Sequence, residues 1–555
     1  MLDSQTQPTL GSGQVATTNN WDTVFAIDFK GVNDGIEAQA KYPKKICQPA
    51  NADPDDADEE HLIGTISTWK LTGGSGHLLE MEMDIPTFTM QVEDEDETIV
   101  SVTRTNAKVT IQISLHTEMG QEESGLGGGT PVSFRFNPSN TLLSDRGVFP
   151  ITVLSMSWPG SSGEQDLADD ARLFMGQFFN RSDINDAFDH TFATVHINSR
   201  IADAEGETDF SWIAPTDTAY GVIAKDDAQG GGAFAVLCMT KQNVAPNHQN
   251  VSPEVLGDAR AGFLINKPMF LEHMIQPGLA AMFGREVDDD TFIEENFVID
   301  TDSITNSETL ALDEFEVRPT KGSTEKVMAI VPKRSFSISM LDTRLVINFN
   351  GLHHPYFKRV WYLYEAYHYY TIQAAASFDP ATRKFGLVPV DADGDKAVSY
   401  RAALEKSVAG KVVDIALLVL DILAVVGTVY NGAKVLKNGV AVAANAEAVG
   451  PILGSARLGR IATSLRDFFV KPIVGLSFSI LAGAGGIAFG LIKEAYENAR
   501  EDDPENIKPD MQTFATKVLA PVVWPEGTGL EVTQVAFNGG LHITGNPDFT
   551  SEPSS

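Results

Sequence analysis

Long alternations between apolar and polar side chains are the feature that most constrains the fold of this chain. In the segment LLEMEMDI (78–85) apolar residues alternate with acidic ones, and KVTIQISL (108–115) repeats the pattern. Because successive side chains on a strand point to opposite faces, this period indicates antiparallel strands with one apolar and one solvated face. Glycine-rich or acidic turns such as TGGSG and EDEDE separate the strands, which predicts a long meander.

The segment NNWDTVFAIDFKGVNDGI (19–36) precedes this meander and predicts an amphipathic helix, with Asn20 as its N-cap. A helix packed on a sheet is the common interpretation of such a stripe. A helix inside a curled sheet would instead line an apolar groove. Its apolar residues fall at spacings of 4, 4, 3 and 4, which is one helical face: Trp21, Phe25, Phe29, Val32 and Ile36.

The pattern of a helix followed by strands occurs twice along the chain. A second helix is predicted over 165–179, and the apolar run 263–283 predicts another helix that enters a new sheet. Strands return from about residue 297 and include a long hairpin that turns at Asp379-Pro380. We therefore expect a flexible N-terminus (1–18), a first domain (19–255) and a second domain (256–555).

Residues 401–500 predict an apolar helical insertion in the second domain. The stretch 473–492 contains 20 residues without a charge, which as a helix would span about 30 Å, the thickness of a bilayer core. The alternative is a buried insertion that caps one end of the sheet, and Asp414 and Asp421 argue against a membrane span in the first part. The candidate membrane contacts are Ile473, Phe478, Ile480, Ile487 and Phe489.

Composition and the absence of known motifs argue against several classes of function. A net charge of −34 argues against nucleic acid as a partner, since phosphate binding needs clustered Lys and Arg. The sequence contains no HExxH, P-loop or GxSxG motif, so we expect no enzyme activity, no catalytic residues, no metal site and no cofactor. Residues 1–20 lack the pattern of a secretory signal, which predicts a cytoplasmic protein or one released by a signal-independent route.

Six segments along the chain carry a family resemblance: NNWDTVFAIDFKGVN (19–33), FDHTFATVHIN (188–198), FSWIAPTDTAYGV (210–222), FAVLCMT (234–240), FLINKPMFLEHMIQP (263–277) and AASFDPATRK (375–384). They resemble the 47-kDa accessory proteins encoded in clostridial neurotoxin clusters, the OrfX relatives. The resemblance implies a tubular lipid-binding (TULIP) fold, in which a long helix lies inside a strongly curved antiparallel sheet. The expected fold class is therefore α+β, with two TULIP-like units and the helical insertion.

Two functions from different classes follow. In the first, the protein binds a lipid, a fatty acid or another apolar molecule in the groove. In the second, the interior is filled by side chains and the protein is a structural accessory component of a toxin complex, with toxin or accessory proteins as partners. Contact with a membrane surface through 473–492 is a third prediction. The candidate groove residues are Trp21, Phe25, Phe29, Val32, Ile36, Phe270 and Met274.

Overall fold

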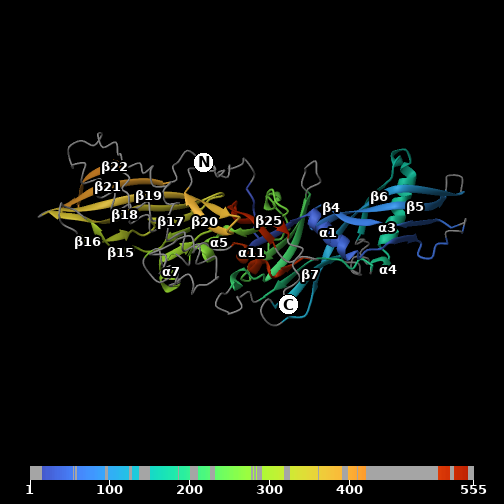
Figure 1. Ribbon diagram of the computed structural model, residues 1–555, viewed down its shortest axis with the longest axis horizontal. Helices are drawn as coiled ribbons and strands as arrows, with labels where there is room; N and C mark the ends of the chain where they lie inside the picture. Colours follow the sequence, from blue (N-terminus) through green and yellow to red (C-terminus); the bar gives the residue numbers. More distant parts are fainter. Residues whose placement is uncertain are drawn as a thin grey trace.

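The computed structural model shows an elongated molecule with antiparallel sheets at its two ends (Figure 1). Strands β4–β6 and helix α3 lie at one end, and β15, β16, β18, β19, β21 and β22 lie at the other. The structure describes residues 15–53, 56, 59–93, 98–123, 128–136, 151–185, 187–199, 210–224, 232–276, 279, 283, 290–317, 325–359, 362–389, 398–408, 411–419, 511–524 and 530–547.

The larger sheet runs β23-β9-β7-β6-β5-β4-β10-β11-β1-β12-β25-β24, with β2, β3 and β8 attached at its sides. The alternation predicted for β5 and β6 is confirmed, because the apolar residues of both strands are buried on one face. Its strands are β1 (Thr23–Asp28), β2 (Lys45–Gln48), β3 (His61–Thr65), β4 (Thr68–Gly76), β5 (Leu78–Glu93), β6 (Ile99–Met119), β7 (Thr130–Phe136), β8 (Ile151–Ser157), β9 (Thr191–Ile197), β10 (Asp217–Ala224), β11 (Gly232–Met239), β12 (Ala261–Asn266), β23 (Val522–Val523), β24 (Leu530–Phe537) and β25 (Gly540–Pro547).

The second sheet runs β13-β14-β17-β18-β19-β21-β22, with β15, β16 and β20 attached at its sides. The predicted hairpin is confirmed: β19 and β20 pair antiparallel up to Asp379 opposite Lys384. Its strands are β13 (Phe297–Ile299), β14 (Ser303–Asn306), β15 (Leu310–Val317), β16 (Glu325–Val331), β17 (Phe336–Met340), β18 (Leu345–Arg359), β19 (Tyr362–Asp379), β20 (Lys384–Pro389), β21 (Val398–Val408) and β22 (Lys411–Val419).

The predicted opening helix over 19–36 is wrong in its first half. Residues Thr23–Asp28 form β1, and helix α1 covers only Phe29–Gln39. The run TVFAI is apolar or β-branched throughout, which suits a central strand buried on both faces, and β1 lies between β11 and β12. The N-cap is Asp28 rather than Asn20: its carboxylate accepts a 2.7 Å hydrogen bond from the Gly31 N–H.

The predicted helix over 263–283 is likewise wrong in its first part, and residues 267–275 are helical as predicted. Strand β12 comes first, followed by the short helix α5 (Lys267–Phe270) and the π-helical turn η4 (Leu271–Ile275). Asn266 caps α5 by accepting a 2.9 Å hydrogen bond from the Met269 N–H. Strands β1 and β12 pair antiparallel with Phe25 opposite Phe263. The chain therefore repeats a strand, a polar cap and a helix, and the two repeats lie side by side at the centre of the larger sheet.

The helix predicted over 165–179 is confirmed as α3 (Gln165–Phe179). It buries Ala171, Met175 and Phe178, packs against β8, β2 and β3, and lies at the same end of the molecule as β5 and β6 (Figure 1). The remaining helical segments are the short helices α4 (Ser182–Asn185), α7 (Asp290–Asn296) and α11 (Met511–Leu519), and the 3-10 turns η1 (Ser161–Gly163), η2 (Ser211–Ile213) and η3 (Pro253–Val255).

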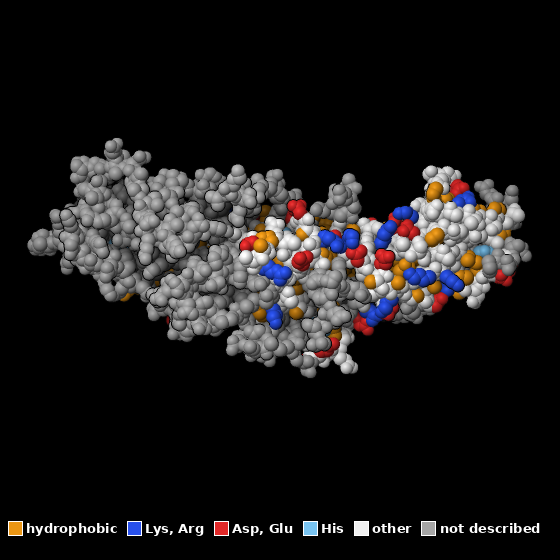
Figure 2. All heavy atoms as spheres, in the orientation of Figure 1, with side chains coloured by type: hydrophobic (Ala, Val, Ile, Leu, Met, Phe, Trp, Pro, Cys, Tyr) orange, Lys and Arg blue, Asp and Glu red, His pale blue; other side chains and the backbone are white. Residues whose placement is uncertain are grey.

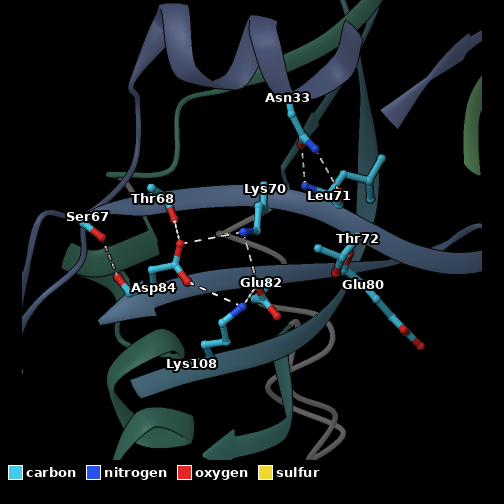
Figure 3. A network of polar contacts seen from close by, with 10 residues as sticks. All are labelled: Asn33, Ser67, Thr68, Lys70, Leu71, Thr72, Glu80, Glu82, Asp84 and Lys108. Carbon is cyan, nitrogen blue, oxygen red and sulfur yellow. Dashed lines mark hydrogen bonds and ion pairs between the residues drawn. The ribbon is translucent and has the colours of Figure 1, made fainter. Parts of the chain in front are cut away.

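Helix α1 is joined to β4 through one side chain. The Leu71 N–H donates to Asn33 Oδ1 at 2.7 Å, and Asn33 Nδ2 donates to the Leu71 carbonyl at 3.0 Å (Figure 3). Pairing of β4 with β10 is confined to residues 75–76 of β4, and the β4–β5 register shifts between Leu71 and Gly73. Asn33 thus satisfies a strand edge that would otherwise lack backbone partners.

The two sheets meet in the middle of the molecule, where the late segments β24, β25 and α11 lie (Figure 1). The Gly539 N–H donates to the Asp342 carbonyl at 2.8 Å, and Lys267 Nζ lies 2.8 Å from the Asp342 carboxylate. Sheet membership does not follow the predicted boundary near residue 255, because β12, β24 and β25 belong to the same sheet as β1. The domain limits remain predictions.

The helical insertion predicted from residue 401 is wrong in its first part. Residues up to Val419 form the strands β21 and β22, which pair with Lys406 opposite Asp414. An apolar run rich in valine suits a strand as well as a buried helix, and β21 extends the sheet beside β19. The rest of the insertion, including Ile473, Phe478, Ile480, Ile487 and Phe489, lies outside the described residues. Among the helices that the structure does describe, none has the length and apolarity needed to cross a membrane.

Candidate functional site

The predicted groove residues, with the exception of Trp21, lie together in the main hydrophobic core. Phe25 and Phe29 come from β1 and the start of α1, and Val32 and Ile36 from the buried face of α1. Phe270 and Met274 come from α5 and η4. None of these six side chains exposes more than 7% of its surface, and all belong to one core cluster.

Other side chains fill the space around these residues. The Phe25 ring packs edge-on against Phe263 and Trp524, with centroids 6.2 and 5.5 Å away. Phe270 packs against Phe537 at 5.3 Å. A methyl group added at Gly232 would lie 2.3 Å from the Phe29 ring, so the backbone of β11 already touches that ring. At these positions the interior is packed protein.

Trp21 lies on the other side of the sheet. Phe25 and Ile27 of β1 face the main core, whereas Val24 and Ala26 face a second cluster that contains Trp21. The segment 240–257 contributes Val251, Val255 and Leu256 to this second cluster. The helical interpretation placed Trp21 and Phe25 on one face, but the strand between them separates their surroundings.

A pocket of about 360 Å³ lies next to Trp21. Its walls come from the start of β10 and from the loop that follows β11. This is the candidate functional site, and sequence reasoning missed it because its lining residues form no motif. The lining residues are Trp21, His77, Asp217, Thr218, Ala219, Ala245, Pro246, Asn247, His248 and Gln249.

The segment 19–22 holds the loop wall of this pocket at both ends. Asn19 Nδ2 donates to the Asn250 carbonyl at 3.0 Å, and Asn243 Nδ2 donates to the Asp22 carboxylate at 2.9 Å. Residues 244–249 are therefore held at both ends by hydrogen bonds to the segment that contains Trp21. Such pre-positioning is typical of binding sites on loops that a rigid scaffold supports.

Three buried polar atoms of the pocket residues lack a hydrogen-bond partner within the described part of the chain. They are Trp21 Nε1, His248 Nδ1 and Gln249 Oε1. Unsatisfied buried polar atoms are few in native proteins, and a cluster of them at one pocket calls for an explanation. Asp217 adds a carboxylate whose Oδ1 accepts a 2.8 Å hydrogen bond from the Thr218 N–H. The three unpartnered atoms are closed off from solvent, so the polar groups that the wall presents are those of exposed residues such as Asp217 and Asn247.

Burial also shifts the pKa values of several groups outside the pocket. Burial, and to a smaller extent the nearby charge of Lys41, lower the pKa of His190 to about 3; the ring packs edge-on against Trp69 and Phe192. Burial raises the pKa of Tyr220 to about 12, and its hydroxyl donates to the His77 carbonyl at 2.8 Å. Both groups are neutral over the physiological pH range and stabilise the packing between strands.

The outer surface of β4–β6 carries paired charges rather than a patch of one sign. Lys108 Nζ donates to Glu82 at 2.8 Å and lies 3.9 Å from Asp84, while Lys70 lies 3.2 Å from Glu82 (Figure 3). The hydrogen bond to Glu82 raises the pKa of Lys108. On the face seen in Figure 2, basic and acidic side chains are likewise mixed over the described part of the surface.

Comparison with known proteins identifies the family. The sequence profile of the OrfX-like family, described as Protein OrfX2/OrfX3/P47, matches residues 18–352 of the 555. Protein OrfX3 of Paraclostridium bifermentans is 24% identical over 293 residues, which are 51% of this chain and 57% of that protein. Protein OrfX3 of Clostridium botulinum (strain Kyoto / Type A2) is 23% identical over 289 residues, 49% of this chain and 56% of that protein. The chain thus spans little more than half the length of these curated relatives.

Solved structures agree in fold over nearly the whole chain. P47 from Clostridium botulinum A2 superimposes with a TM-score of 0.54 at 15% identity, covering 96% of this chain and 98% of that one. P47 of Clostridium botulinum E1 gives a TM-score of 0.51 at 13% identity, covering 95% and 98%. The family match over more than half of the sequence leads to one conclusion: this chain belongs to the OrfX-like family of OrfX2, OrfX3 and P47.

Proposed function

We propose that this protein is a non-enzymatic accessory component of the toxin-cluster type that acts as an interaction scaffold with a filled core. The observation that carries the proposal is the packing of the predicted groove. Phe25, Phe29 and Phe270 are almost completely buried, and their rings touch other core side chains rather than open space. The elongated shape offers a large surface for contact with partner proteins (Figure 1).

Non-enzymatic action is supported by the relatives, which carry the names OrfX3 and P47 rather than the name of an enzyme. The partners that this function implies are proteins encoded beside it in the same cluster. When these proteins of the same cluster are purified, at least one of them should bind the full chain in sedimentation or calorimetry experiments. If none of them binds, the scaffold function is wrong.

Binding of a lipid or fatty acid is the second candidate function. It is favoured by the continuity of the apolar interior, since one core cluster contains Met81 of the larger sheet and Phe336 of the second sheet. A bound acyl chain would gain about 0.8 kcal/mol per buried methylene. It would first have to displace side chains that are already packed. Membrane contact through 473–492 remains a prediction.

Native mass spectrometry after detergent-free purification separates the two candidates. The filled core predicts the mass of the chain alone and no lipid in an organic-solvent extract. A Phe270→Ala variant provides the matched control, because an apolar cavity made by removing a buried ring stays dry and can take up benzene. If the unmodified protein carries one lipid per chain, lipid binding becomes the first candidate function and the scaffold the second.

A further inference from the structure

The turn between β24 and β25 contacts both the N-terminal segment and the second sheet. The Ala16 N–H donates to Asn538 Oδ1 at 3.1 Å, and a methyl group added at Gly539 would lie 1.8 Å from the Ala16 carbonyl oxygen. The Gly539 N–H donates to the Asp342 carbonyl of the second sheet at 2.8 Å. Residues 15–18 are therefore held against this turn by a hydrogen bond and by close packing, at the place where the two sheets meet.

The hydrogen bonds continue from Ala16 through Asn538 to His542 and end at η3. Asn538 Nδ2 lies 3.4 Å from His542 Nδ1, and His542 Nε2 lies 2.7 Å from the Val255 carbonyl oxygen. The groups at the two ends fix every direction, because a backbone N–H can only donate and a carbonyl can only accept. Asn538 therefore turns its oxygen to Ala16 and its NH2 group to His542. The His542 ring is neutral, carries its proton on Nε2 and accepts at Nδ1.

This arrangement has no place for a second proton on the His542 ring. A proton on Nδ1 would make that nitrogen a donor, and it faces the NH2 group of Asn538, which is also a donor. The amide can rotate so that its oxygen accepts from His542, but its NH2 group then faces the Ala16 N–H. The single oxygen of Asn538 thus serves either Ala16 or a protonated His542.

The surroundings of His542 make a ring proton depend on Asn538. Burial lowers the pKa of His542, and the hydrogen bond to the Val255 carbonyl opposes this lowering. Within the described part of the chain, no charged side chain makes a hydrogen bond to the ring. Arg260 and Lys267 are each paired with a carboxylate, at 2.9 and 2.8 Å, and Glu531 lies near the other end of β24. The segments packed around the ring are residues 15–18, η3 and the turn that follows it, β12, α5 and β24, and their charged side chains are Glu254, Asp258, Arg260, Lys267 and Glu531.

We propose that residues 15–18 form an acid-sensitive latch: protonation of His542 turns the Asn538 oxygen away from Ala16 and releases the N-terminal segment from the β24–β25 turn. The latched form binds the second ring proton more weakly than the released form, because only in the released form can the Asn538 oxygen accept it. Acidification below about pH 6.5, the ordinary pKa of histidine, therefore shifts the population towards the released form.

Hydrogen exchange at the Ala16 amide of the full chain, corrected for the intrinsic pH dependence of exchange, tests this inference. Between about pH 7.5 and pH 5 the protection of this amide should fall about 3- to 10-fold, as expected for one hydrogen bond, while the amides of β12 keep their protection. His542→Gln removes the titrating group and should abolish the fall. The inference is overturned if protection of Ala16 does not change with pH, or if it falls equally in His542→Gln.

Asn538→Asp is a second variant, which keeps the inference testable if His542→Gln does not fold. Aspartate has the shape of asparagine but two acceptor oxygens, so one can accept from Ala16 while the other accepts from protonated His542. The fall in protection should therefore disappear, and its persistence would contradict the latch. His190→Leu is the control, because His190 is also buried and has a lowered pKa but has no part in these hydrogen bonds. It should keep the fall in protection; if the fall disappears there, general acid destabilisation causes it and the latch is wrong.

Discussion

Asp22 and Thr240 are joined by two hydrogen bonds: the Thr240 N–H and its hydroxyl both donate to Asp22 Oδ2, at 2.8 and 3.0 Å. The same carboxylate accepts from Asn243 at 2.9 Å and from Asn266 at 3.0 Å. One buried side chain before β1 therefore fixes the end of β11, the base of the pocket loop and the cap of α5.

Replacement of Asp22 should be costly. Asp22→Ala leaves several buried donors without an acceptor, and we expect the free energy of unfolding to fall by about 3 kcal/mol or more. Asp22→Asn keeps one acceptor oxygen and should cost less. Lys30→Ala, which removes an exposed ion pair with Asp34, is the control and should change stability by less than about 0.5 kcal/mol. If Asp22→Ala and Lys30→Ala lose the same free energy of unfolding in urea denaturation, Asp22 does not have this role.

Two glycines should respond in opposite directions to alanine. A Cβ at Gly262 would lie 1.7 Å from the Val255 carbonyl oxygen, which also accepts a 2.7 Å hydrogen bond from His542 Nε2. Gly262→Ala should therefore destabilise the protein by about 3 kcal/mol. Gly176 lies inside α3 with open space where a Cβ would be, so Gly176→Ala should stabilise by about 0.5–1 kcal/mol. Thermal unfolding of the two variants checks both effects. If Gly262→Ala does not lower the melting temperature, the backbone at Gly262 is not closely packed against Val255.

His190 should make the fold sensitive to acid. Its pKa is about 3 in the folded chain, against about 6.5 for an exposed histidine, so below pH 6.5 the unfolded chain takes up a proton that the folded chain does not. Stability therefore falls as pH falls, by about 1.4 kcal/mol at pH 5.5 for this residue. His190→Leu should lose less stability than the unmodified chain between pH 8 and pH 5.5. If the unmodified chain and His190→Leu show the same pH dependence of stability in chemical denaturation, the fold does not lower the pKa of His190.

Asn33 should be needed to hold α1 against β4. Asn33→Ala leaves the Leu71 N–H and carbonyl without the partners that they now have, and we expect a loss of about 1–3 kcal/mol. Glu37→Ala changes an exposed residue of the same helix and should stay within about 0.5 kcal/mol of the unmodified protein. Hydrogen exchange at Leu71 provides a local measurement, with faster exchange expected in Asn33→Ala alone.

Regular periodicity made parts of the fold predictable. The alternation in β5 and β6 and the helical spacing in α3 both correspond to faces that the structure buries. The α+β class and the strongly curved antiparallel sheet follow instead from the family resemblance. The two predicted long helices are absent at residues 23–28 and 261–266, because TVFAI and AGFLI contain only small, apolar or β-branched residues and lie in strands covered on both faces. The polar caps Asp28 and Asn266 were the available signal for where each strand ends and each helix begins.

The pocket could not be predicted from the sequence. Its residues come from the segment before β1, the turn between β4 and β5, the start of β10 and the loop after β11, and they meet because β4, β10, β11 and β1 are successive neighbours in the sheet. Trp21 was chosen as a groove residue for its spacing from Phe25. The strand geometry of β1 places the two residues in different clusters.

The pairing of β12 with both β1 and β25 has a consequence for biosynthesis. Strand β25 covers one edge of β12, and the contact between His542 of β25 and Val255, just before β12, joins residues 287 positions apart. During translation this edge of β12 is therefore open long before β25 is made. Open edges of this kind recruit foreign strands. The nascent polypeptide would therefore depend on chaperones, or on fast release, to escape aggregation until β25 covers that edge.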